Sequence, residues 1–131
     1  MDNIGLKEIG AVFVGGGLGA SARVWLSAWF DARWSGLLPQ IGVLSVNLLG
    51  CFAIGFGAVW LAHPVWRLAV LGGVLGGFTT YSAFALLSLE HAQAGRHGVV
   101  LAQILVHLIG GVLAVWGGMS LAKALGLGPT S

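Results

Sequence analysis

Charged side chains are scarce in this sequence. Asp, Glu, Lys and Arg make up 8% of its 131 residues, whereas 57% are hydrophobic and the mean hydropathy is +0.95. A soluble domain carries about 25% charged residues, so this composition excludes an ordinary soluble domain. The net charge of +2 comes from residues scattered over loops and ends, which does not indicate nucleic-acid binding. The single cysteine, Cys51, cannot form a disulfide within the chain, and we interpret it as a packing residue.

Four long apolar segments account for most of the chain, at about residues 9–30, 41–61, 66–89 and 98–121. Each matches the roughly 20 residues that a helix needs to cross a bilayer, and none shows the alternating pattern of a barrel strand. The short connections leave no room for an extramembrane catalytic domain. The sequence therefore predicts a single all-α integral membrane domain over residues 1–131 that is not an enzyme.

The basic residues of the connections give almost no orientation signal. Lys7, Arg67 and Lys123 belong to one side of the predicted bundle, and Arg33 and Arg96 to the other. Either other signals set the topology, or the chain inserts both ways round. Four helices of this length can hardly enclose a pore alone, which favours an antiparallel dual-topology dimer with its two-fold axis in the membrane plane.

Acidic residues are absent from the interior of all four segments, since Asp31 and Glu90 lie at segment ends. A proton-coupled cation exporter normally needs an embedded carboxylate, so this absence argues against a small multidrug-type exporter. Arg23, in contrast, lies inside the first segment. It is either an interfacial anchor or a positive charge near the entrance of an ion path.

A few uncharged polar residues also lie within the segments. Asn47 in the second segment is either a hydrogen-bonding contact between helices or a pore residue. For Gln103 and His107 in the fourth segment, helix packing is the favoured interpretation and pore lining the alternative.

Glycine and hydroxyl residues are concentrated in the third segment, in the stretch GGVLGGFTTYSAF at residues 72–84. Its four glycines, and the GxxxG pair of Gly15 with Gly19, are typical of closely packed membrane helices. The letters GGGLGA at residues 15–20 also match a dinucleotide-binding fingerprint, but they lie inside an apolar span rather than between a strand and a helix. Because glycine weakens a helix interior, the cluster predicts a break in the third span.

Around this predicted break, the side chains favour an anion. Thr79, Thr80 and Ser82 can satisfy the backbone groups that a break frees. Tyr81 and Phe84 share one helix face, where they either pack against neighbours or present their positive ring edges to an anion. Neutral donors without a fixed negative charge suit a small anion that must not be held tightly.

Three motifs in series, GGLGASAR, VNLLGCFAIGF and GGFTTYSAF, resemble the Fluc (CrcB) fluoride-channel family over nearly the whole chain. The resemblance implies a dual-topology antiparallel homodimer in the inner (plasma) membrane. Such a dimer has two pores and passes fluoride passively out of the cytoplasm, which relieves fluoride toxicity.

The resemblance also implies roles for individual residues. Asn47 resembles the pore asparagine, Tyr81 and Phe84 the pore aromatics, and Arg23 the arginine of the first span. Thr80 and Ser82 fall on the hydroxyl-bearing segment of the pathway. Gly76 and Thr79 match positions whose backbone carbonyls hold a structural sodium ion at the dimer centre.

This sequence departs from the family pattern at three places. Tyr81 stands where phenylalanine is usual, and Ala83 where threonine is common. The fourth span lacks the hydroxyl-bearing pore residues expected of the family. It offers Gln103, His107 and, much later in the span, Ser120. Such departures are compatible with altered conduction or with a heterodimer formed with a second homologue. A non-conducting membrane assembly subunit stays open as the remaining alternative.

Overall fold

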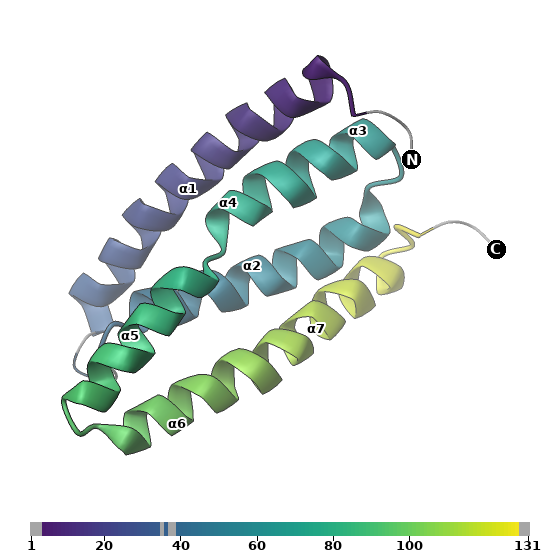
Figure 1. Ribbon diagram of the computed structural model, residues 1–131. Coiled ribbons are helices and arrows are strands. Elements are labelled where there is room, and N and C mark those ends of the chain that lie inside the picture. Colours follow the sequence, from purple (N-terminus) through teal and green to yellow (C-terminus); the bar gives the residue numbers. More distant parts are fainter. Residues whose placement is uncertain (1–3, 35, 37–38, 129–131) are drawn as a thin grey trace.

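The computed structural model describes residues 4–34, 36 and 39–128, and this part of the chain is helical with short connections (Figure 1). Four helical stretches are long and apolar enough to cross a membrane: Leu6–Trp34, Ile41–Trp60, Pro64–Gln93 and His97–Ala124. Their bounds lie within a few residues of the predicted segments, so the prediction of four membrane-spanning helices is confirmed.

The first two spans are single helices, and the last two are composite. Helix α1 covers Leu6–Trp34 and α2 covers Ile41–Trp60. The third span consists of α3 (Pro64–Arg67), η1 (Leu68–Leu75), α4 (Gly76–Phe78) and α5 (Tyr81–Gln93). The fourth consists of α6 (His97–Leu105), η2 (Val106–Gly110) and α7 (Gly111–Ala124). The segments η1 and η2 are π-helical, a form that is wider than the α-helix and is frequent at functional sites.

Charged residues at the ends of the spans satisfy free backbone groups of α2. At its beginning, the backbone N–H of Gly42 donates to Asp31 Oδ1 at 2.8 Å. At its end, Arg67 Nη1 donates to the carbonyl oxygens of Ala58 and Leu61 at 2.7 and 2.9 Å. A carboxylate at the N-terminus and a guanidinium at the C-terminus both complement the helix dipole, so these charges stabilise the two ends of α2.

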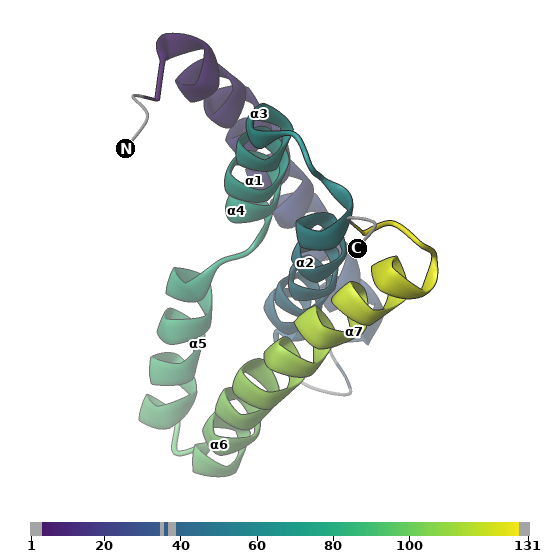
Figure 2. The same cartoon turned by 90° about the vertical axis from the view of Figure 1, so that its right-hand side faces the viewer.

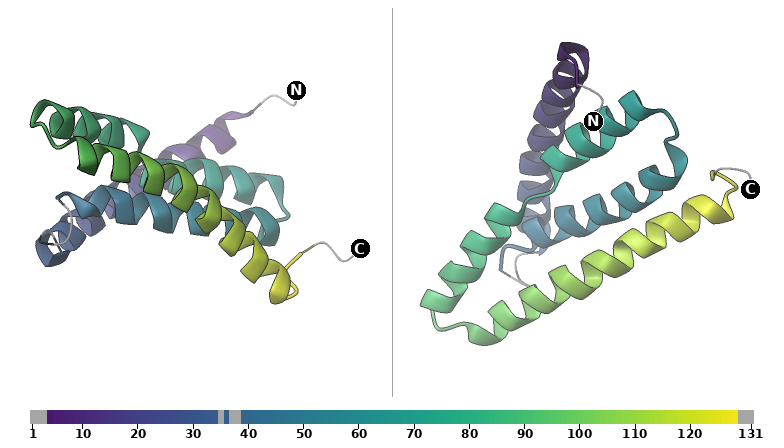
Figure 3. Two further views of the ribbon diagram at one scale, coloured as in Figure 1. Left: turned by 90° about the horizontal axis from the view of Figure 1, so that it is seen from below. Right: turned by 45° about the vertical axis from the view of Figure 1, so that its right-hand side comes forward.

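Two helix pairs form the packed part of the molecule. Helix α2 lies along the fourth span, and α1 lies against η1 and α4 (Figure 3). Glycines make both contacts close. A Cβ on Gly19 would overlap the carbonyl oxygen of Val74, and one on Gly55 would overlap that of Val115. The sequence prediction of glycine-mediated packing is therefore confirmed for Gly15 and Gly19, and likewise for Gly73 and Gly77, which lie against α1. It is not confirmed for Gly72 and Gly76, which are exposed and whose Cβ positions meet only atoms of their own span, at 3.7 Å.

Helix α5 stands apart from the rest of the third span. It leans away from α4 and packs against α6 and α2 (Figure 2). The beginning of α1, the α2–α3 connection and the end of α7 lie at one end of the bundle, and the α5–α6 turn lies at the other (Figure 1). The two halves of the third span thus diverge between α4 and α5, and the candidate site lies at this point.

Candidate functional site

The third span changes conformation at two residues. Thr79 (φ −88°, ψ 154°) and Thr80 (φ −149°, ψ 120°) have extended backbones and separate the end of α4 from the beginning of α5. We refer to these two residues as the interruption. The four glycines on which the sequence prediction rests precede it and are themselves helical. Of these glycines, Gly73 and Gly77 allow α1 to approach, and the extended residues follow them.

Hydroxyl groups satisfy part of the backbone at the interruption. Thr79 Oγ1 donates to the carbonyl oxygen of Leu75 at 3.0 Å. Thr80 is the N-cap of α5, because its Oγ1 accepts a hydrogen bond from the backbone N–H of Ala83 at 3.2 Å. Ser82 Oγ lies 3.1 Å from Thr80 Oγ1. A helix N-terminus of this kind carries a partial positive charge that favours anions.

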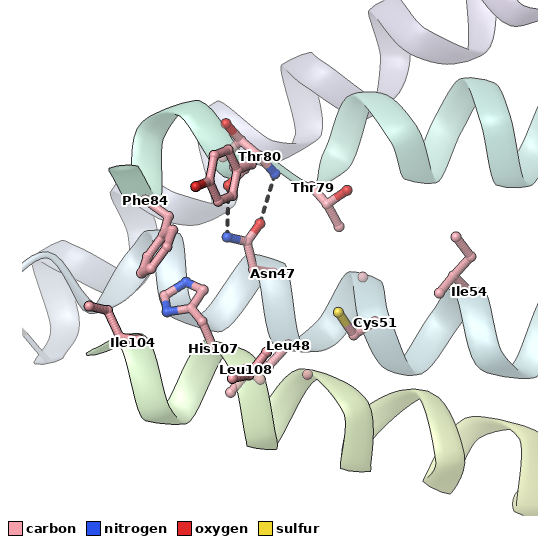
Figure 4. Close-up of a pocket in the computed structure, with 13 residues that line it drawn as sticks. Asn47, Leu48, Cys51, Ile54, Thr79, Thr80, Phe84, Ile104, His107 and Leu108 are labelled. Carbon is pink, nitrogen blue, oxygen red and sulfur yellow. Dashed lines mark hydrogen bonds between the residues drawn. The ribbon is translucent and has the colours of Figure 1, made fainter. Parts of the chain in front are cut away.

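Asn47 of α2 holds the interruption from the opposite side. Its Nδ2 donates to the carbonyl oxygen of Thr80 at 2.9 Å, and its Oδ1 accepts from the backbone N–H of Thr80 at 2.8 Å (Figure 4). The side chain is 7% exposed. Two reciprocal hydrogen bonds to one residue fix the extended backbone, and the second N–H of Nδ2 stays available because an amide nitrogen has two donors.

A cavity of about 450 Å³ lies between α2, the interruption, α5 and the fourth span (Figure 4). Its wall is mostly apolar, with a few polar groups on one side. The lining residues are Asn47, Leu48, Gly50, Cys51, Ile54, Thr79, Thr80, Tyr81, Phe84, Ile104, His107, Leu108 and Gly111. None of these lining residues is an Asp, Glu, Lys or Arg. The cavity therefore offers neutral donors and ring edges and has no fixed charge.

Aromatic rings line the α5 side of this cavity. The ring centroids of Tyr81 and Phe84 lie 5.8 Å apart, so the two rings share a face as the spacing predicts. The ring of Phe84 lies 4.2 Å from the imidazole of His107, centroid to centroid, and 37° from parallel. Tyr81 is 79% exposed, so its ring forms the open rim of the cavity.

Two predicted pathway residues lie outside the cavity wall. Ser82 is exposed and reaches only Thr80 among the described residues. Arg23 Nε donates to the carbonyl oxygen of Gly77 at 3.2 Å, close to the end of α4. Its positive charge therefore complements the negative C-terminal end of that short helix. Of the predicted set, the structure brings Asn47, Thr80, Tyr81 and Phe84 together around the cavity.

The interruption also frees two backbone carbonyl groups. In an uninterrupted helix the Gly76 carbonyl would accept from the N–H of Thr80, and the Thr79 carbonyl from that of Ala83. Here these N–H groups donate to side-chain oxygens of Asn47 and Thr80 instead. Gly76 is exposed and Thr79 half-buried. Free carbonyl oxygens of this kind are ligands for a hard monovalent cation, so these positions fit a sodium site.

Comparison with known proteins assigns the chain to a family. The family described as "CrcB-like protein, Camphor Resistance (CrcB)" matches residues 10–119. The chain belongs to this CrcB-like family. The match includes most of each of the four spans and every residue of the site.

Curated CrcB-like relatives carry a functional name. A protein of Burkholderia pseudomallei named "Fluoride-specific ion channel FluC" is 41% identical over 124 residues, which cover 89% of this chain and 94% of that protein. Proteins of the same name from Escherichia fergusonii and Salmonella arizonae are 38% and 39% identical, each over 85% of this chain and 93% of the relative. These names describe ion channels rather than enzymes.

His107 lines the cavity, which is the alternative and not the favoured interpretation of its sequence. For both His107 and Gln103 the favoured interpretation is helix packing. The residue type alone does not distinguish packing from pore lining. The structure separates the two. Gln103 is buried with its side-chain Oε1 unpaired among the described residues, whereas His107 lines the cavity against Phe84. Its spacing of one helical turn from Gln103 gave no signal of this difference.

Proposed function

We propose that this protein is a passive fluoride channel that lets fluoride leave the cytoplasm and so relieves fluoride toxicity. The observation that carries the proposal is the uncharged cavity at the interruption, where Asn47, Thr80 and Phe84 converge. Curated relatives over most of the chain are named fluoride-specific channels, which gives the anion its identity.

The chemistry of the cavity suits a small, strongly hydrated anion. An ion that leaves water needs replacement donors at each position, yet must not be bound tightly. The free N–H of Asn47, the hydroxyls of Thr80 and Ser82 and the N-terminal end of α5 supply hydrogen-bond donors. The rings of Tyr81 and Phe84 supply weakly positive edges. Arg23, beside the end of α4, adds positive charge near the pathway.

We propose that the interruption makes the third span a broken helix that serves both an anion path and a cation site. The extended dihedrals of Thr79 and Thr80 support this division. A sodium ion, when bound, would supply a fixed positive charge at the centre of the assembly. The free carbonyls of Gly76 and Thr79 would hold it, and one such pair from each of two subunits would give four oxygens.

We propose that the working unit is an antiparallel dual-topology homodimer in the inner membrane. The nearly balanced basic residues of the two ends support insertion in both orientations. The thin, open fold supports the need for a second copy, since only Val46 and Ala122 are fully buried hydrophobic residues among those described. A heterodimer with a second homologue is the variant of this proposal that the sequence departures suggest.

The test is fluoride efflux from liposomes that contain the purified protein. Fluoride is followed with an ion-selective electrode, and valinomycin with potassium clamps the voltage. We expect efflux much faster than from protein-free vesicles, and unchanged when a protonophore removes any proton gradient. Efflux no faster than from empty vesicles would favour a non-conducting assembly subunit. Dependence on a proton gradient would favour an exporter.

Two measurements test the assembly and the sodium site. In a Cys51→Ala background, Ala124→Cys should be labelled by an impermeant thiol reagent in about half of the molecules of intact cells, as expected for dual topology. Full or absent labelling would contradict it. Replacing sodium by N-methylglucamine should lower the thermal stability of the purified dimer. This organic cation is too large to bind between the carbonyl oxygens in place of sodium. Equal stability in both solutions would argue against bound sodium.

A further inference from the structure

His107 is the one residue of the cavity wall that can change its charge in the physiological pH range. It lies in the π-helical segment η2, and its ring stacks on Phe84, one of the proposed pathway residues (Figure 4). No residue of the cavity wall in α2 or α5 is a histidine. The fourth span therefore contributes an imidazole to the wall.

The hydrogen bonding of His107 defines which ring nitrogen carries the proton. Its Nδ1 lies 2.9 Å from the backbone carbonyl oxygen of Gln103. A carbonyl only accepts, so Nδ1 carries the proton in the neutral ring and Nε2 is left with a lone pair. Nε2 is buried and has no hydrogen-bond partner among the described residues.

Protonation reverses the chemistry of this unpaired nitrogen. In the neutral ring, the Nε2 lone pair would repel an anion that approaches it. In the protonated ring, Nε2–H is a donor on a positively charged group, and such charge-assisted hydrogen bonds are roughly twice as strong as neutral ones. The same side chain thus opposes or supports an anion according to its protonation state.

The surroundings contain no group that would mask this change. Among the cavity-lining residues, α2 contributes Cys51 and α5 contributes Tyr81, and neither element adds an Asp, Glu, Lys or Arg to the wall. The fourth span, to which His107 belongs, adds only Ile104, Leu108 and Gly111 to the wall besides His107 itself. Arg23 contacts Gly77 and is not part of the wall.

We propose that His107 contacts the permeant anion and that fluoride conduction rises as this residue takes up a proton. The inference rests on the proposed channel function and adds an anion-contacting residue to it. It gives the fourth span of this chain an anion donor where hydroxyl residues are missing.

The experiment measures fluoride current through the purified protein in planar bilayers, with the same pH on both sides. Current is used because neutral hydrogen fluoride, which also crosses lipid at low pH, carries none. Between about pH 8 and about pH 5.5, a range that spans the usual histidine value of about 6.5, we expect the wild-type current to rise about tenfold. His107→Gln and His107→Asn should give currents that do not change with pH. The matched control is His97→Gln, since His97 is exposed at the beginning of α6; it should keep the wild-type pH profile.

The outcomes separate this inference from the channel proposal. A wild-type current that is present but flat with pH would overturn the role of His107 and leave the channel standing. A pH dependence that persists in His107→Gln or His107→Asn would also overturn it, because another group would then be titrating. Absence of current at every pH would overturn both proposals. Two substitutions are included so that a variant that fails to fold does not decide the result.

Discussion

Replacing Asn47 with leucine removes both hydrogen bonds that hold the interruption. Asn47 donates to the Thr80 carbonyl at 2.9 Å and accepts from the Thr80 N–H at 2.8 Å. Hydrogen bonds between membrane helices average about 0.6 kcal/mol each, which gives about 1.2 kcal/mol for the pair. A backbone group left buried and unpaired costs about 1–3 kcal/mol, and Thr80 is half-buried. We therefore expect Asn47→Leu to lower the free energy of unfolding by about 1–3 kcal/mol.

The same substitution should also remove an anion donor from the cavity. The loss of one donor worth about 1.4 kcal/mol corresponds to about tenfold in rate, so efflux should slow by at least about that factor. Stability is measured by SDS titration in mixed micelles, followed by the fluorescence of the six tryptophans, and efflux by the electrode assay. Gln93→Leu, the same change of side-chain type at an exposed position of α5, should alter neither.

The result separates the two roles of Asn47. Loss of efflux with stability unchanged would mean that Asn47 acts only on the ion. Loss of stability with efflux within about twofold of wild type would reduce it to a contact between helices. Wild-type values in both assays would refute the reasoning from the two hydrogen bonds.

Three further predictions concern packing, the cavity rim and the thiol. Gly19→Ala should destabilise the fold by about 1–3 kcal/mol in the SDS titration, because its Cβ would overlap the Val74 carbonyl. The control Gly17→Ala has open space around it and should be neutral or up to about 1 kcal/mol stabilising. Tyr81→Phe should leave efflux within about twofold of wild type, since the phenol oxygen has no hydrogen-bond partner among the described residues; a larger loss would make the hydroxyl a donor to the ion. A small thiol reagent should slow efflux by modifying Cys51 in the cavity wall, and Cys51→Ala should resist it; equal inhibition of both proteins would place the reaction elsewhere.

The four spans could be predicted because their signal is local. A stretch of about 20 apolar residues matches the thickness of the bilayer regardless of its neighbours, and the helices observed at Leu6–Trp34 and Ile41–Trp60 follow the apolar segments closely. Residue type also marked the candidate site. Asn47 and the aromatic pair Tyr81 and Phe84 are exceptional in their segments, and the structure brings them to one cavity.

The partners of these residues depended on the tertiary structure. Asn47 pairs with Thr80, 33 positions away, and Arg23 with Gly77, 54 positions away. Such pairs are set by the rotation and axial offset of one helix against another, which hydropathy does not encode. The same offset brings Gly19 against Val74 while Gly72 and Gly76 face away from the chain. It also turns His107 towards Phe84 rather than into the packed interior. The sequence thus determined which segments enter the membrane and which side chains are unusual there, and helix packing decided which of them meet.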